Sequence, residues 1–167
     1  MNFDEESNPR QSFKVEFNVS SDLQALIENL NNDLKNEWTH LTFYLHSAAL
    51  VQGLHATEYK ELLQKEANKE LLHVGQFSDV LIGLGLSPEN LAKEPFLHKV
   101  LSLTDPKDIL AHALNLEEEV VRNYCIRMHE AEMCGCTDGD WVHIFLEGQI
   151  QDSREDVDHL KQILKGL

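Results

Sequence analysis

The chain has 167 residues, with 29 acidic and 14 basic side chains and a formal net charge of −15 at pH 7. This length fits one domain with a sizeable core, and the acidic balance argues against nucleic acid or an anionic membrane surface as a direct partner. No apolar stretch reaches the length of about 18 residues that a membrane span requires, so we expect none. The composition suits a protein that handles cations.

The N-terminus and the cysteines indicate the compartment. Residues 1–6 are acidic and lack the apolar run of a signal peptide, and three cysteines do not make an even-numbered disulfide framework. We therefore expect the cytoplasm, with Cys134 and Cys136 as free thiols.

Residues 1–20 are predicted to form an extended N-terminal arm that is partly disordered. Apolar residues alternate with polar ones from Phe13 to Val19, which is a strand period, but no later segment offers a pairing strand. We expect the arm to lie on its own bundle or on a neighbouring subunit.

Residues 21–167 are predicted to form one all-α domain, an antiparallel four-helix bundle with a long crossover between the second and third helices. Apolar residues recur there at helical spacing, and short connections within each helix pair favour antiparallel neighbours. Thr57 is the expected cap of the second helix, and Asp105-Pro106 the start of the third. We expect the four helices at 21–51, 57 to 83–85, 105–133 and 141–167. The crossover is expected at 86–104, with a short helix at 96–101, and the last turn at 134–140.

Ionisable side chains interrupt the predicted apolar faces at one height. Glu37 lies on the inward stripe of the first helix and Glu117 on that of the third, each followed seven residues later by a tyrosine (Tyr44 and Tyr124). The tyrosines are interpreted first as core aromatics. Carboxylates at core positions are costly unless they are paired or bound to metal.

The second helix carries Glu70-Leu71-Leu72-His73 on the same inward face. One helical turn separates Glu70 from His73, so both side chains can reach one ion. The motif alone is weak, because eighteen glutamates and nine histidines give roughly one occurrence by chance, and Glu37-x-x-His40 is a second. His40 is interpreted as a core or surface histidine rather than a ligand. Glu66 either supports the site from one turn away or faces solvent.

The register of the fourth helix follows from its apolar steps. The apolar residues that follow His73 have the same spacing as those that follow Asp156. Ser153 therefore corresponds to Glu70, and Asp156 corresponds to His73. A shift of three residues would instead make Asp156-x-x-His159 the motif, but it would bring polar positions onto the apolar face. It is ranked second, and His159 stays a candidate outer ligand.

Carboxylates from several helices with one imidazole predict a site for two metal ions in the bundle core. Hard oxygen ligands with one nitrogen favour iron, with manganese possible, over zinc. Over residues 21–167 this pattern resembles the ferritin-like superfamily of non-haem ferritins, bacterioferritins and Dps proteins. The matching residues are Glu37, Glu70, His73 and Glu117, with Ser153-x-x-Asp156 departing from the second Glu-x-x-His of bacterioferritins.

The resemblance implies a ferroxidase that oxidises Fe(II) with dioxygen or peroxide, for iron storage or detoxification in a homo-oligomer. The implied metal ligands are the four matching residues, which would be catalytic, together with Asp156. Two alternatives stay open: a small dimetal oxygenase or peroxidase acting on an organic substrate, and a metal-free bundle that serves as an assembly module.

Overall fold

The computed structural model describes residues 21–96 and 102–167. The N-terminal arm expected at 1–20, and all but the first residue of the short helix expected at 96–101, lie outside these residues. The described parts contain four helices and no strand, which confirms the all-α prediction. The helices are α1 (Ser21–Leu50), α2 (Ala56–Gly83), α3 (Pro106–Met133) and α4 (Thr137–Lys165).

The start of α3 follows the predicted capping chemistry. The Asp105 carboxylate accepts hydrogen bonds from the backbone N–H groups of Lys107 and Asp108, at 2.9 and 3.3 Å, and Pro106 occupies the first helical position. These contacts satisfy N–H groups that have no partner within the helix. They set the point at which the long crossover ends.

Two other helix starts differ from the prediction. Helix α2 begins at Ala56 rather than after a Thr57 cap, and the preceding His55 has left-handed backbone (φ 67°) and no side-chain cap. Helix α4 begins at Thr137 instead of 141, because the Cys136 sulfur accepts from the Gly139 N–H at 3.4 Å and caps the helix. A Cβ at Gly139 would lie 2.4 Å from the Ala131 carbonyl oxygen, so this tight turn needs glycine.

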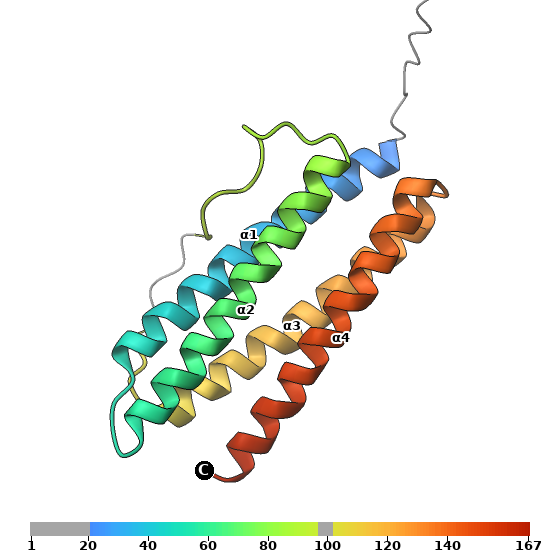
Figure 1. Cartoon of the computed structure of the whole chain (residues 1–167). Helices are drawn as coiled ribbons and strands as arrows, with labels where there is room; N and C mark the ends of the chain where they lie inside the picture. Colours follow the sequence, from blue (N-terminus) through green and yellow to red (C-terminus); the bar gives the residue numbers. More distant parts are fainter. Residues whose placement is uncertain (1–20, 97–101) are drawn as a thin grey trace, which may run out of the picture.

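The helices form two antiparallel pairs. Helices α1 and α2 pack against each other, as do α3 and α4, and α1 also packs against α3, whereas α2 and α4 make few close backbone approaches (Figure 1). The crossover returns the chain along the bundle, so α2 and α3 run in the same direction (Figure 1). It is fastened to α1 by hydrogen bonds, including one from Trp38 Nε1 to the Ala92 carbonyl at 3.1 Å.

The core consists of two apolar clusters with a polar layer between them. One cluster contains Leu30, Phe77 and Leu146, and the other contains Leu41, Leu63 and Leu160. The inward stripe that helical spacing predicts for α1 is buried throughout, at Leu23, Ile27, Leu30, Leu34, Glu37, Leu41, Tyr44 and Ala48. The layer between the clusters contains these buried polar residues: Asp33, Glu37, His40, Glu66, Glu70, His73, Glu117, Gln149, Ser153 and Asp156.

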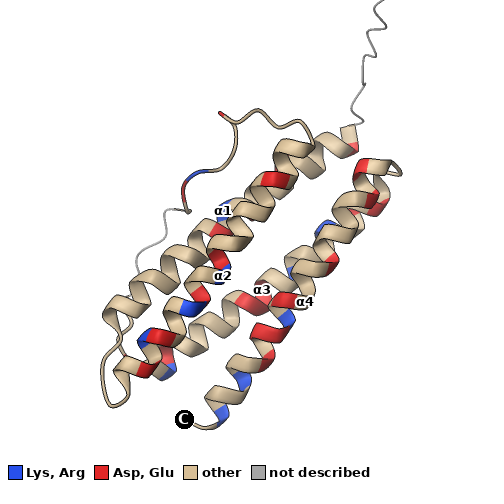
Figure 2. Ribbon diagram, in the orientation of Figure 1, with Lys and Arg blue, Asp and Glu red and all other residues tan. Residues whose placement is uncertain are grey.

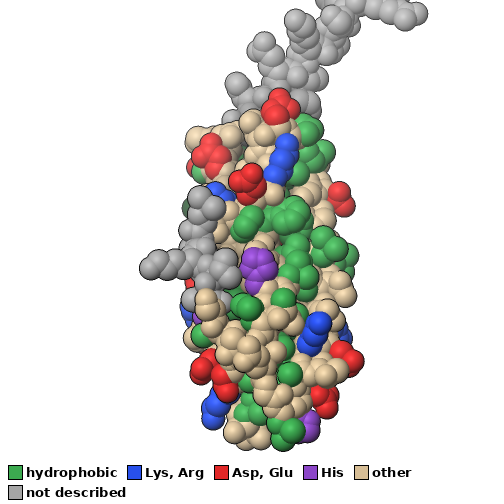
Figure 3. All heavy atoms as spheres, turned by 90° about the vertical axis from the view of Figure 1, so that its left-hand side faces the viewer, with side chains coloured by type: hydrophobic (Ala, Val, Ile, Leu, Met, Phe, Trp, Pro, Cys, Tyr) green, Lys and Arg blue, Asp and Glu red, His purple; other side chains and the backbone are tan. Residues whose placement is uncertain are grey.

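Acidic residues occur along all four helices (Figure 2), and hydrophobic side chains gather on one face of the surface (Figure 3). The exposed large hydrophobic residues include Leu71 and Leu72, which are 54% and 60% exposed and occupy the two middle positions of the Glu70-x-x-His73 motif. Within the described ranges, no helix is both long and apolar enough to span a bilayer.

Candidate metal centre

Three predicted ligands meet in the polar layer. One ligand atom from each of Glu37, Glu70 and His73 lies within 4.8 Å of the others, and all three side chains are buried. His73 Nδ1 is 3.4 Å from Glu37 Oε2 and 3.5 Å from Glu70 Oε2. The predicted pairing of Glu70 with His73 across one turn of α2 therefore converges with Glu37 of α1.

A second group shares Glu70 with the first. Ligand atoms of His40, Glu70 and Glu117 also lie within 4.8 Å of one another. His40 is buried, as one reading of the sequence allowed, but its place beside two carboxylates was not expected. The available signal was the Glu37-x-x-His40 spacing, which repeats on α1 the turn that joins Glu70 to His73 on α2.

Two tyrosines hold two of the carboxylates in a crossed arrangement. Tyr44 on α1 donates a hydrogen bond of 2.8 Å from its hydroxyl to Glu117 Oε1 on α3. Tyr124 on α3 donates to Glu37 Oε1 on α1. Each tyrosine thus orients the glutamate of the other helix, and not the glutamate that precedes it by seven residues on its own helix.

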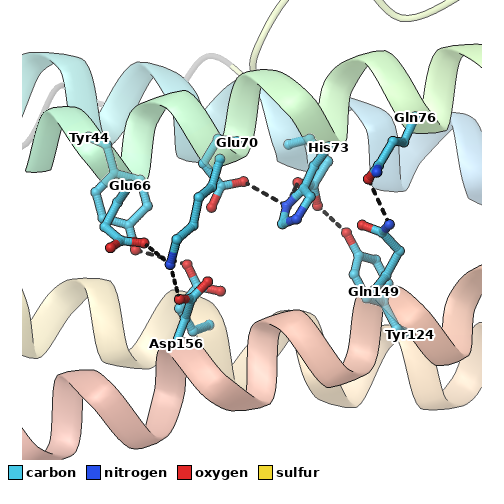
Figure 4. Close-up of polar contacts among 11 residues, drawn as sticks. Tyr44, Glu66, Glu70, His73, Gln76, Tyr124, Gln149 and Asp156 are labelled. Carbon is cyan, nitrogen blue, oxygen red and sulfur yellow. Dashed lines mark hydrogen bonds and ion pairs between the residues drawn. The ribbon is translucent and has the colours of Figure 1, made fainter.

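Helix α4 contributes in the register ranked first. Gln149, Ser153 and Asp156 are buried, whereas His159 is exposed and does not join the layer. Asp156 faces Glu66 across the space between α2 and α4 (Figure 4), and Lys69 Nζ contacts Asp156 Oδ1 and lies 2.8 Å from Glu66 Oε2. Asp156 is in neither three-residue group and contacts this lysine instead.

Burial and mutual contacts shift the pKa values of the carboxyl groups in the polar layer. Burial raises the pKa of Glu70 well above its ordinary value, and the neighbouring Glu37 charge adds to the effect. Burial also raises the pKa of Glu117, to about 8, against the hydrogen bond from Tyr44. Burial would raise the pKa of Glu37 as well, but the hydrogen bond from His73 and the charges of His40 and His73 lower it.

The histidines respond in opposite directions. Burial alone would lower the pKa of His73, but hydrogen bonds to Glu37 and Glu70 raise it to about 10. Burial lowers the pKa of His40, which favours the neutral imidazole, the form whose lone pair can bind a metal ion. The raised pKa of His73 thus keeps a positive charge beside the Glu37 and Glu70 carboxylates.

Several buried oxygens lack a hydrogen-bond partner. They are Glu66 Oε1, Gln149 Oε1 and Glu70 Oε2, all on α2 or α4, and the last of these has only His73 Nδ1 at 3.5 Å, beyond good hydrogen-bond geometry. A buried oxygen without a donor is unfavourable, and for a carboxylate the cost is larger still. The donor set of carboxylate oxygens and imidazole nitrogens suits a hard or borderline divalent cation, which would satisfy these atoms.

Comparison with known proteins identifies the family. The family model described as "Ferritin-like domain" matches residues 27–167. The chain belongs to this ferritin-like family. No curated protein matches the sequence.

Solved structures agree with this ferritin-like assignment. A structure from Bacillus anthracis str. Ames, described as ferritin-like, diiron-carboxylate proteins, is 27% identical, with a TM-score of 0.75 over 87% of this chain and 99% of that one. The Dps protein of Vibrio cholerae O1 is 14% identical (TM-score 0.75, 86% and 91% covered). The Dps protein of Bacillus brevis is 15% identical (TM-score 0.76, 87% and 98% covered). The predicted ferritin-like bundle is thereby confirmed.

Proposed function

We propose that this ferritin-like protein takes Fe(II) as its substrate and oxidises it with dioxygen or peroxide, for iron storage or detoxification. The proposal rests above all on the two buried three-residue groups that share Glu70. Glu37, Glu70, His73 and Glu117 are the proposed catalytic ligands. His40 joins them on the geometry, and Asp156 is a further proposed metal ligand.

The ligand chemistry supports oxidation of the bound ion. Hard carboxylate oxygens bind Fe(III) more strongly than Fe(II), and binding that favours the product oxidation state promotes the loss of an electron. With dioxygen as oxidant, two Fe(II) each lose one electron, and dioxygen takes both with two protons to give hydrogen peroxide. Manganese is an alternative ion for the same donor set.

Assembly and location complete the proposal. Relatives described as Dps and diiron-carboxylate proteins support a metal-binding homo-oligomer, and the adjacent exposed Leu71 and Leu72 offer apolar surface for subunit contacts. The net charge of −15 supports a protein that attracts cations rather than nucleic acid. We propose a cytoplasmic location, a reducing compartment that suits the free thiols of Cys125, Cys134 and Cys136.

Anaerobic Fe(II) titration followed by exposure to air tests the function. We expect stoichiometric uptake and rapid oxidation without any organic substrate, and loss of both in Glu70→Ala and His73→Ala. Glu118→Ala is the matched control, because Glu118 neighbours Glu117 but pairs with Lys161 at the surface. Equal, trace iron in wild type and both variants would overturn the proposal and favour the metal-free alternative.

Gel filtration tests the storage half of the proposal. A closed shell of many subunits is expected, because mineral storage needs an enclosed volume. A dimer would contradict storage while leaving oxidation for detoxification in place.

A further inference from the structure

Lys69 holds two buried carboxylates in the manner of a metal ion. Its Nζ contacts Asp156 Oδ1 on α4 and lies 2.8 Å from Glu66 Oε2 on its own helix. The carboxylate side chains are 7% and 8% exposed, whereas the lysine side chain is 35% exposed. Lys69 therefore reaches from the surface and places its charge inside the polar layer.

The acidic side chains around Lys69 carry more negative charge than its single positive charge can neutralise. Glu66 Oε1 remains buried without a hydrogen-bond partner, and Glu70 Oε2 on the other side of this lysine has only His73 Nδ1 at 3.5 Å. The charge of Asp156 adds to burial in raising the pKa of Glu117, so these two carboxylates act on each other. A divalent ion that bound Asp156 together with Glu117 would have to displace the Lys69 ammonium, which already contacts Asp156 Oδ1.

We infer that Lys69 is a tethered cation that competes with a metal ion for Asp156. Asp156 then becomes a metal ligand only after the ammonium has moved out to solvent. The inference rests on the proposed function, since it concerns the ions of the same site. It assigns the two halves of the centre different strengths: Lys69 does not compete for the ion of the Glu37–Glu70–His73 group, whereas an ion that needs Asp156 binds weakly.

Lysine suits this role chemically. Its ammonium is compact and strongly hydrated at the end of a flexible stem, so it can exchange a buried carboxylate for water at low cost. Its contacts with Glu66 and Asp156 raise its pKa above the ordinary value, although burial opposes this, so the group stays charged. A unit positive charge a few ångströms from a divalent ion lowers the affinity for that ion about tenfold or more.

Calorimetric titration with Co(II), which is stable in air, tests the inference on wild type and Lys69→Gln. We expect a strong and a weak binding step in wild type. In Lys69→Gln the weak step should strengthen about tenfold or more, or become detectable, while the strong step stays unchanged. Lys69→Arg, which keeps the charge, and Lys65→Gln, which removes an exposed lysine one turn away, should behave as wild type.

Lysine acetylation mapped by mass spectrometry supplies a second readout on wild type, which remains valid if Lys69→Gln does not fold. Saturation with Co(II) should increase the reactivity of Lys69 and leave that of Lys65 unchanged. Identical titrations for wild type and Lys69→Gln, or unchanged Lys69 reactivity, would overturn this inference and leave the proposed function intact. No Co(II) or Fe(II) uptake by either protein would overturn both.

Discussion

Contacts between α1 and α3 and contacts between α2 and α4 close the same polar layer in different ways. Between α1 and α3 the backbones pack closely, and Tyr44, Tyr124 and Arg127 donate hydrogen bonds to buried carboxylates. Between α2 and α4 the bridges are Lys69 with Asp156, and Gln76 with Gln149, and the unpartnered buried oxygens lie on these helices. We therefore expect the α1–α3 contacts to contribute most to stability, because the α2–α4 side leaves buried oxygens without a donor.

Removing Arg127 should have the largest effect. Its Nε lies 2.7 Å from Asp33 Oδ2, and Asp33 is 2% exposed. Arg127→Met leaves that carboxylate buried without a cation, which should lower the free energy of unfolding by about 3–5 kcal/mol. Urea denaturation of the metal-free protein measures the change.

Lys161→Met is the matched control, because the Lys161–Glu118 pair is exposed and should contribute little. Asp33→Asn combined with Arg127→Met should recover part of the loss. If Arg127→Met were as stable as wild type, the structural role assigned to the α1–α3 side would be wrong.

The stability of the metal-free protein should fall as pH rises. The pKa of Glu117 is raised from 4.5 to about 8, so its contribution is complete below pH 4.5 and is lost as pH rises through 8. The pKa of His73 is raised from 6.5 to about 10, so its contribution is lost as pH rises through 10. Each pH unit costs about 1.4 kcal/mol for each proton that only the folded state retains.

Thermal melts between pH 6 and pH 10 in a chelating buffer follow this dependence. Glu117→Gln should flatten the part near pH 8, because the amide is neutral throughout. A melting temperature that rises over this range would contradict the proposed protonation of the layer.

Loss of a tyrosine hydroxyl should cost less. Tyr44→Phe removes the 2.8 Å hydrogen bond to Glu117 Oε1 but keeps the ring. We expect a loss of about 1–2 kcal/mol in the metal-free protein, since the buried carboxylate loses a donor. Tyr59→Phe, on the partly exposed face of α2, is the control, and urea denaturation at one pH compares the two.

The glutamine bridge should matter least. Gln149 Nε2 donates to Gln76 Oε1 at 2.9 Å, while Gln149 Oε1 is buried without a partner. Gln149→Met removes that unpartnered oxygen along with the bond, so the net change should be below about 1 kcal/mol. A loss as large as that of Arg127→Met, measured in the same urea series, would mean that the α2–α4 side is structural too.

The sequence was sufficient for the bundle and for the inward position of most polar residues in its core. Helical periodicity predicts that Glu37, Glu70, His73 and Glu117 face inward, and the structure buries all four. The same reasoning placed Ser153 and Asp156 on the buried face of α4, where the structure has them.

Three features that the sequence did not predict depend on helix packing, on side-chain length and on an uncommon cap. His40 lies beside the predicted α1 stripe, and its burial depends on how closely α3 approaches α1, which periodicity does not encode. Lys69 starts from a partly exposed position and enters the layer only because its stem is long. The early start of α4 depends on a sulfur cap at Cys136, an uncommon signal at that position.

The crossed tyrosines tie the centre to the joining of the two hairpins. The first antiparallel pair, α1 and α2, carries the tyrosine donor for Glu117, and the second pair, α3 and α4, carries the tyrosine donor for Glu37. A nascent chain that has formed only the first pair therefore lacks the tyrosine donor to Glu37, although His73 already lies beside that carboxylate. The final orientation of Glu37 and Glu117 is thus a product of docking the two halves of the chain, and neither half can complete it during synthesis.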